Sequence, residues 1–199
     1  MSHYYTPDPR LPHDIEVFTY EIKGKKLQFA TDAGVFSRQK VDYGSNLLLN
    51  FLPPLEGRVL DLGCGYGPIG ICLAVLNPGI EVTMVDINRR AVALAKENAR
   101  ANGVNNVRIF ESDGFAAVSG SFSAIVSNPP IRAGKKVIYP LFEQSCEYLD
   151  AGGSLWLVIQ KKQGAASAVA KLESIFANCS VEDKSGGYWL LRSIKTPAK

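Results

Sequence analysis

Residues 59–70, with the sequence VLDLGCGYGPIG, place closely spaced glycines directly between an apolar segment of strand character and an apolar helical segment. Glycine allows a tight backbone turn and lets the backbone approach a ligand closely. Pro68 suits the first turn of the following helix, where a missing N–H costs nothing. The stretch therefore predicts a strand, a ligand-binding turn and a helix in succession.

From about residue 57 onward, short apolar segments alternate with segments of helical spacing. This alternation predicts an α/β, Rossmann-like fold, in which a mostly parallel sheet is covered by helices on both faces. Ligands of such sheets bind at the carboxyl ends of the strands. The predicted strands are residues 58–62, 81–87, 107–111, 122–127, 154–160 and 188–194, and the clearest helices are residues 89–101 and 137–149.

The segment before this alternation has a different character. Residues 17–22 and 27–30 predict a β-hairpin that turns at residues 24–26. With 199 residues and 46% hydrophobic content, the chain is expected to form a single domain with a substantial core. We divide this domain into a loose tail at 1–14, an N-terminal hairpin extension at 15–50 and an α/β core at 51–199.

Composition excludes several classes of protein. The formal charge of +3 is too small to indicate nucleic-acid binding unless the basic residues cluster. The four cysteines form no CxxC pair and both histidines lie in the N-terminal tail, so we expect no metal site and reduced thiols. No apolar run is long enough to cross a membrane, and the N-terminus lacks an apolar signal segment, so the prediction is a cytoplasmic protein.

Two cofactors are compatible with the glycine-rich turn. Gly65, Gly67 and Gly70 satisfy the GxGxxG pattern of dinucleotide-binding proteins. Asp61, which precedes Gly63 at the end of the strand, would repel a pyrophosphate but attract the aminopropyl ammonium group of S-adenosylmethionine. We therefore predict S-adenosylmethionine, with S-adenosylhomocysteine as its product, rather than NAD.

Further polar residues follow the next two predicted strands. Asp86 ends its strand where a carboxylate can accept hydrogen bonds from both ribose hydroxyls, and Ile87 could cover one face of the adenine. Asp113 could accept from the adenine amino group, with a backbone N–H at Gly114 nearby. The alternative makes Asp86 and Asn88 helix-capping residues and Asp113 a turn residue, and for Asn88 we favour the cap.

The motif Asn128-Pro129-Pro130 follows the fourth predicted strand. The NH2 group of a nucleobase or an amide is a poor nucleophile because its lone pair is delocalised. Two acceptors aimed at its hydrogens would orient it for attack on a methyl group, and the Asn128 side-chain oxygen and the Pro129 carbonyl could be these acceptors. The prolines hold the preceding residues out of the helical region and offer no competing N–H. A simple rigid turn is the alternative.

Together, the glycine-rich turn, residues 35–45 and residues 128–134 resemble the class I methyltransferases of the Asn-Pro-Pro type, and within them the family of ribosomal RNA small-subunit methyltransferase C. The resemblance covers nearly the whole chain from about Phe18. It implies a seven-stranded sheet with an antiparallel last strand and methylation of a guanine N2 amine in small-subunit rRNA. By this resemblance, Gly63, Gly65 and Gly67 hold the cofactor, Asp86 its ribose, Asp113 its adenine, and Asn128 with Pro129 the target amine, while Gly44 and Ser45 flank the cofactor.

The chain departs from the family in two places. Ile131 stands where many of these enzymes have an aromatic residue that stacks on the flipped base, so stacking is expected to come from elsewhere or to be weaker. Two-domain members also carry an additional N-terminal domain that we expect this chain to lack. On the substrate side, the basic residues Arg132, Lys135 and Lys136 follow the Asn-Pro-Pro motif and are expected to contact RNA with Arg38.

Two other functions remain open. A protein glutamine N5-methyltransferase that acts on release factors would use a chemically similar NH2 acceptor, although those enzymes resemble NPPY and carry a helical N-terminal domain. A binding module could also keep the cofactor pocket as a scaffold, but the intact Asn128-Pro129-Pro130 argues against lost catalysis.

Overall fold

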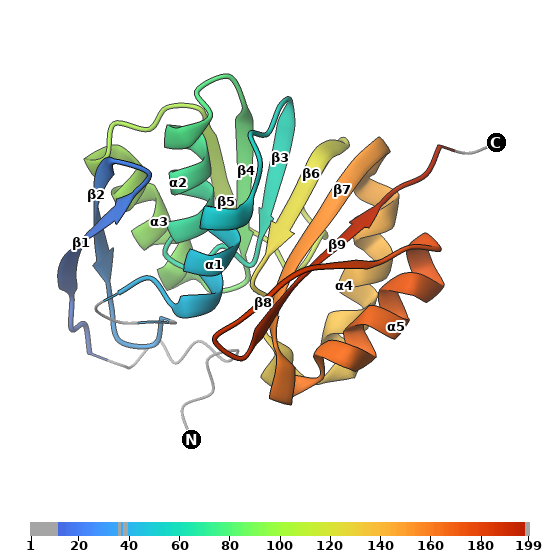
Figure 1. Cartoon of the computed structure of the whole chain (residues 1–199). Helices are drawn as coiled ribbons and strands as arrows, with labels where there is room; N and C mark the ends of the chain where they lie inside the picture. The colour runs from blue at the N-terminus through green and yellow to red at the C-terminus, as the bar shows by residue number, and fades with distance from the viewer. Residues whose placement is uncertain (1–11, 36, 38–39, 198–199) are drawn as a thin grey trace.

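A central β-sheet organises the computed structural model, which describes residues 12–35, 37 and 40–197 (Figure 1). Most of its strands begin and end close to the predicted positions, because they are short apolar runs bounded by turn residues. The strands of this sheet are β3 Arg58–Leu62, β4 Glu81–Asp86, β5 Val107–Glu111, β6 Phe122–Ser127, β7 Leu149–Gln160, β8 Ser180–Ser185 and β9 Tyr188–Ile194.

Within the described residues, this sheet has seven strands in the order β5-β4-β3-β6-β7-β9-β8. Neighbouring strands from β5 to β7 are parallel, whereas β9 is antiparallel to both β7 and β8. The chain leaves β3 in one direction toward β4 and β5 and later returns to the other side of β3 to form β6. The predicted Rossmann-like sheet with an antiparallel last strand is therefore confirmed.

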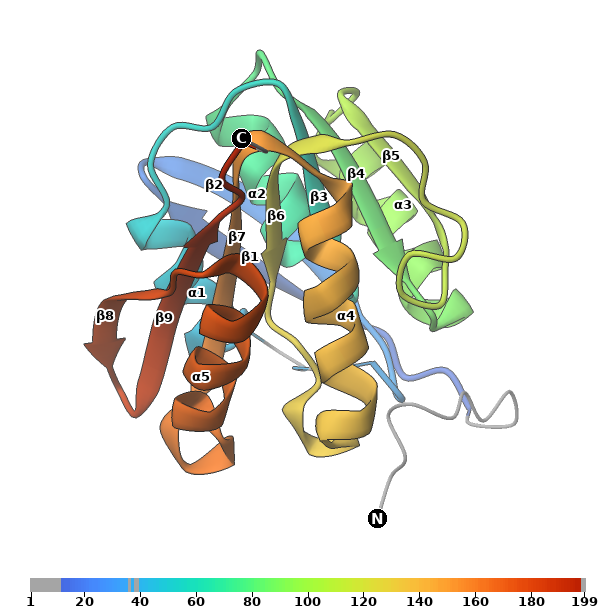
Figure 2. The same cartoon turned by 90° about the vertical axis from the view of Figure 1, so that its right-hand side faces the viewer.

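Helices cover both faces of the sheet, as the alternating pattern predicted. The first three pack on one face and the last two on the other, where Figure 2 shows them side by side in front of the strands. The helices are α1 Tyr43–Phe51, α2 Pro68–Leu76, α3 Arg89–Ala101, α4 Lys135–Tyr148 and α5 Ala165–Phe176, with short 3-10 turns η1 Ile131–Ala133 and η2 Lys161–Gln163.

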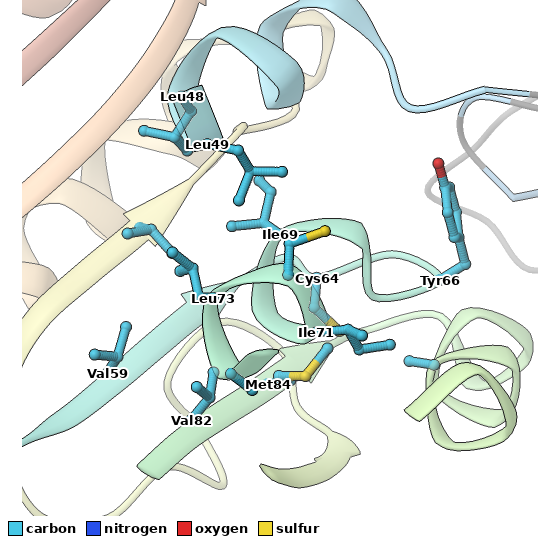
Figure 3. Close-up of a cluster of buried hydrophobic side chains, with 14 of the residues drawn as sticks. Leu48, Leu49, Val59, Cys64, Tyr66, Ile69, Ile71, Leu73, Val82 and Met84 are labelled. Carbon is cyan, nitrogen blue, oxygen red and sulfur yellow. The ribbon is translucent and has the colours of Figure 1, made fainter. Parts of the chain in front are cut away.

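Successive strand residues supply the two halves of the core. Val59 of β3 faces α1, α2 and α3, whereas its neighbour Leu60 faces α4 and α5, and both are fully buried. Figure 3 shows the first half, where Ile71 of α2 lies over Met84 of β4. Helix and strand approach so closely that a Cβ on Gly70 would lie 2.7 Å from Met84. The third glycine of the GxGxxG pattern therefore serves helix-to-strand packing.

The predicted N-terminal hairpin is present as β1 Glu16–Ile22 paired with β2 Lys25–Thr31. Its turn lies at Lys23 and Gly24, slightly before the predicted position, and both residues have the positive φ that two-residue hairpins favour. Phe29 of β2 is fully buried and its ring packs edge-on against Tyr66 at 5.8 Å between centroids. The hairpin is thereby fixed beside the glycine-rich turn.

The sequence patterns missed α1 and β8. Helix α1 is short, and its apolar residues do not by themselves distinguish a helix from a strand. Strand β8 carries charged residues and shows no alternation of buried and exposed positions, as expected for a protected edge strand. Strand β7 also starts at Leu149, five residues earlier than predicted, and an irregularity in its pairing with β6 accommodates the extra length.

Candidate active site

The candidate site lies at the carboxyl edge of the parallel strands. Here the chain reverses the direction in which it adds strands, between β3 and β6, which is where ligands of open α/β sheets bind. Asp61 lies in β3, Asp86 ends β4, and Asn128 follows β6. The fold therefore brings together the three polar residues that the sequence placed at strand ends.

The glycine-rich turn connects β3 to α2 with backbone conformations that suit glycine. Gly63, Gly65 and Gly67 have φ values of 77°, 58° and 98°, in the left-handed region. Among the described residues, a Cβ on Gly63 would meet no atom within 4 Å, whereas one on Gly67 would lie 2.7 Å from the Ile71 side chain. Gly63 thus faces open space that a ligand can use, and Gly67 serves the packing of α2.

Asp61 is fully buried beneath this turn. Its Oδ2 accepts a hydrogen bond from the Gly70 N–H at 2.8 Å, but its Oδ1 has no partner among the described residues. Burial, reinforced by the nearby Asp86 carboxylate, raises the pKa of Asp61 to about 7. The site is therefore short of positive charge, which a cationic group of a ligand would supply.

Asp86 is buried at the end of β4 and binds the glycine-rich turn. Its Oδ2 accepts from the Gly65 N–H and its Oδ1 from the Asn88 N–H, both at 2.8 Å. Burial raises the pKa of this carboxyl group even though these N–H groups stabilise its charged form. Each oxygen keeps a lone pair for a further donor. The adjacent Ile87 is 42% exposed, so its side chain is accessible beside this carboxylate.

Asn88 confirms the capping role favoured for it. Its side-chain oxygen accepts from the backbone N–H groups of Arg90 and Ala91 at the start of α3. Its Nδ2 also donates to the Gly34 carbonyl at 3.2 Å. The same residue thus caps a helix and fixes the segment that follows β2.

Asp113 and Gly114 follow β5, one strand further from β3. Asp113 is exposed. Gly114 has a φ of 53°, which favours glycine, and a Cβ there would lie 2.7 Å from the end of the Leu141 side chain in α4. These two residues lie at the predicted edge of the sheet, but the described residues give the Asp113 carboxylate no hydrogen-bond partner.

The Asn128 side chain has a fixed orientation. Its Nδ2 donates to Asp42 Oδ1 at 2.9 Å and to Ser45 Oγ at 3.1 Å. A carboxylate only accepts hydrogen bonds, so the amide nitrogen must face Asp42 and the amide oxygen must point away from it. Asn128 Oδ1 has no donor among the described residues and can accept one from a substrate.

Asp42 is also the N-cap residue of α1. The same Oδ1 atom accepts from the backbone N–H groups of Gly44 and Ser45, at 3.0 and 3.2 Å, as an N-cap. No role was predicted for Asp42, although an aspartate directly before an apolar helical run is a recognised capping signal. No sequence pattern indicates that Asp42 also contacts Asn128.

The prolines after Asn128 form a tight turn. The Pro129 carbonyl accepts from the Ile131 N–H at 2.8 Å, and Pro130 has φ −75° and ψ 70°, which is an inverse γ-turn. One lone pair of the Pro129 carbonyl remains available for a substrate N–H. The Ile131 side chain is partly buried against the core between the sheet and α4.

The basic residues that follow the turn point in different directions. Arg132 is exposed in η1. Burial raises the pKa of the Tyr188 phenol, and Arg132 lies close enough to offset part of this rise. Lys135 reaches toward α5, with its Nζ 3.4 Å from Ser167 Oγ and 5.9 Å from the centre of the Tyr139 ring. Lys136 is exposed. Arg38 lies outside the described residues.

The described residues offer neither a metal site nor a membrane-spanning helix. Across residues 12–35, 37 and 40–197, histidine, cysteine and carboxylate side chains form no group of three able to hold a metal ion. In the same part of the chain, no helix has the length and apolar character needed to span a membrane.

Comparisons with known proteins agree with this geometry. The family model described as "Methyltransferase small domain" matches residues 26–192. Over 198 residues the chain is 47% identical to the uncharacterized protein YbxB of Bacillus subtilis (strain 168), covering 98% of each chain. It is 36% identical over 186 residues to ribosomal RNA small subunit methyltransferase C of Vibrio vulnificus (strain CMCP6), covering 89% of this chain and 52% of that protein.

A solved structure supports the same relationship. The T. thermophilus 16S rRNA N2 G1207 methyltransferase, in complex with AdoMet and guanosine, superposes with a TM-score of 0.82 and 29% identity. The alignment covers 94% of this chain and 52% of that chain. The chain thus spans about half the length of the small subunit methyltransferase C relatives that it matches.

The buried carboxyl group of Asp61 predicts a pH-dependent stability. Its pKa near 7 in the folded protein exceeds the value near 4 of an unfolded chain, so the folded state binds the extra proton. The free energy of unfolding should therefore decrease, on the order of a few kcal/mol, as the pH rises from about 4 to about 7. Asp61→Asn should remove this part of the pH dependence. Urea unfolding of both proteins at pH 5 and pH 8, without added ligand, measures it. Equal pH dependence in the two proteins would contradict the assignment.

Proposed function

Because the chain belongs to the methyltransferase small-domain family, we propose that it is an S-adenosylmethionine-dependent methyltransferase that modifies the N2 amine of a guanine in small-subunit ribosomal RNA. The observation that carries the proposal is the orientation of the Asn128 amide. Asp42 and Ser45 bind its nitrogen, which leaves its Oδ1 able to accept from an NH2 group. The relatives named as small-subunit rRNA methyltransferases support the choice of substrate. A ribosomal substrate implies a cytoplasmic location.

The residues around the glycine-rich turn fit S-adenosylmethionine. Its ammonium group would supply the positive charge missing at Asp61, whose Oδ1 has no partner among the described residues. The free lone pairs of the Asp86 carboxylate suit a ribose diol, and the space beside Gly63 admits a ligand close to the backbone. A pyrophosphate would add negative charge beside Asp61 and Asp86, which disfavours NAD.

On this basis we propose that the residues predicted from the sequence bind the cofactor. When bound, S-adenosylmethionine supplies a methyl group activated by a positively charged sulfur. Ile87 offers an exposed apolar surface for the adenine and Asp113 an exposed carboxylate for its amino group. The proposed cofactor residues are Asp61, Gly63, Gly65, Gly67, Asp86, Ile87, Asp113, Gly114 and Asn128.

The target amine would be held by Asn128 and Pro129. Asn128 Oδ1 and the Pro129 carbonyl each accept one N–H of the amine, which fixes its direction and favours the pyramidal nitrogen that attacks a methyl carbon. Asp42 and Ser45 keep the Asn128 amide from rotating. Pro130 restricts the backbone that carries the carbonyl. The chain's own contribution to the reaction is therefore orientation.

The RNA would meet the protein at the edge of the site. An N2 amine inside a paired helix is out of reach of a sheet-edge pocket, so the guanine must be unpaired or turned out of its stack. Arg132, Lys135 and Lys136 follow the acceptor turn, and we propose that they contact RNA phosphates, together with Arg38. Ile131 borders the same turn and would contact the base.

A methyl-transfer assay tests the proposed function. The purified protein is incubated with radiolabelled S-adenosylmethionine and small ribosomal subunits that lack the modification, and the labelled nucleotide is then identified. We expect label in N2-methylguanine of the rRNA. A glutamine amide could occupy the same two acceptors, so a release factor is the parallel substrate. Label in the release factor alone would replace the proposal with protein glutamine N5-methylation.

Asn128 and Asp86 should differ in their kinetic effects. Asn128→Ala should lower kcat by about 10² to 10³ with nearly unchanged cofactor affinity, the usual loss when one preorganised polar group is removed. Asp86→Ala should act mainly through cofactor affinity, because a ribose contact is made equally in ground and transition states. Calorimetry with S-adenosylmethionine and steady-state kinetics separate the two. An Asn128→Ala variant of normal rate would remove this residue from the mechanism.

The basic residues near the turn should control the salt dependence of RNA binding. Replacing Arg132, Lys135 and Lys136 with alanine should weaken binding and reduce the slope of log K against log salt by about 2, since three phosphate contacts are lost. The control replaces three exposed cations outside the candidate site with alanine; these are Lys25 and Lys26 at the start of β2 and Arg100 near the end of α3. Equal slopes for the two triple variants would show that the location of the charge is irrelevant and would contradict the RNA-facing assignment.

A further inference from the structure

The position after Asn-Pro-Pro does not supply an aromatic surface for a base. Ile131 occupies it, and its side chain packs against the core between the sheet and α4. Its backbone N–H is used in the γ-turn with Pro129. A planar substrate at Asn128 would therefore need an aromatic ring from another part of the chain.

Tyr188 lies near Asp42, whose carboxylate holds the Asn128 side chain in place. It is the first residue of β9 and pairs with Gln160, at the carboxyl end of β7, so it lies at the edge of the sheet that carries the site. A Cβ on Gly44 would lie 3.1 Å from Tyr188 Cε1 and 3.2 Å from Asp42 Oδ1. Asp42 Oδ1 is the atom that accepts from Asn128, so the ring lies on the same side of Gly44 as the carboxylate that orients the amide.

Two charged side chains of opposite sign, Asp42 and Arg132, lie close enough to Tyr188 to act on its phenol. Burial raises the pKa of the phenol, the Asp42 carboxylate raises it further, and Arg132 lowers it. Asp42 orients the Asn128 amide, and Arg132 is an exposed cation just after the acceptor turn. The ring thus lies near the carboxylate that orients Asn128 and near a cation that would hold a phosphate.

Tyr43 provides a comparison, because its ring lies 5.6 Å from that of Tyr188. The Tyr43 hydroxyl bonds Ser185 Oγ at 2.7 Å, and its ring fills the space above Gly186 in the turn between β8 and β9. These contacts join α1 to the hairpin. The Tyr188 hydroxyl, in contrast, has no hydrogen-bond partner among the described residues, although the residue is half-buried. Tyr188 packs against the core beside α1 and against the Tyr43 ring, but its hydroxyl is left unused beside the site.

We propose that Tyr188 is the aromatic residue against which the target base packs, in place of an aromatic residue after Asn-Pro-Pro. The proposal rests on the proposed function, since it names the part of the site that receives the base. Stacking of a base on an aromatic side chain is favourable for every base because each has a π-face. Tyr188 therefore holds the base plane, and Asn128 with Pro129 selects the amine on its edge.

Kinetics of three variants test this role. Tyr188→Leu should lower kcat/KM for unmethylated small subunits by about 10- to 100-fold, the usual effect of losing one base stack. Tyr188→Phe should keep most of the activity, because the ring remains, and both variants should bind S-adenosylmethionine normally. Tyr43→Leu serves as the matched control and should affect stability more than kcat/KM. A Tyr188→Leu enzyme of normal kcat/KM would overturn the proposal.

A binding measurement keeps the proposal testable without turnover. The protein is labelled with 3-fluorotyrosine, loaded with S-adenosylhomocysteine and titrated with guanosine monophosphate, and the Tyr188 fluorine signal is identified by its loss in Tyr188→Phe. We expect this signal to shift more than that of Tyr43. An unchanged Tyr188 signal at saturating nucleotide overturns the proposal. If the signal shifts but small subunits are not methylated, the ribosomal substrate is wrong and the role of Tyr188 in base contact stands.

Discussion

The parallel strands end at one edge of the sheet, and the positions of Asp61, Asp86 and Asn128 depend on this constraint. The order β4-β3-β6 places Asp86, Asp61 and the turn at Asn128 on neighbouring strands, although the chain separates them widely. The glycine-rich turn lies between these groups and presents its backbone to the same edge. Strand order thus builds the site before any side-chain detail is considered.

The Asp42 carboxylate links the start of α1 to this edge. Asp42 Oδ1 accepts the two N–H groups that begin α1 and one N–H of the Asn128 side chain. Helix α1 is held in turn by Leu48 and Leu49, which are fully buried in the core. The orientation of the Asn128 amide therefore depends on apolar packing of a helix that itself makes no part of the Rossmann-like sheet.

The buried carboxylates oppose folding in the absence of a ligand. Asp61 leaves one oxygen without a partner among the described residues, and burial raises the pKa values of Asp61 and Asp86. Unpaired buried polar groups are costly and concentrate where a protein binds its ligand. The backbone N–H groups of Gly65 and Gly70 offset part of this cost, because each donates to one oxygen of a buried carboxylate. A cationic ligand with a diol would satisfy what remains.

The sequence by itself determined the strands at 58–62 and 107–111, the glycine-rich turn and the placement of Asp61, Asp86 and Asn128 at strand ends, because these follow from local patterns and from one rule about parallel sheets. It did not determine α1, the edge strand β8, or the contact of Asp42 with Asn128, which lie 86 residues apart in the chain. Nor did it place the Tyr188 ring over Gly44. Only the tertiary structure decided these contacts, because they depend on how distant elements pack, and packing leaves no periodic pattern in either segment.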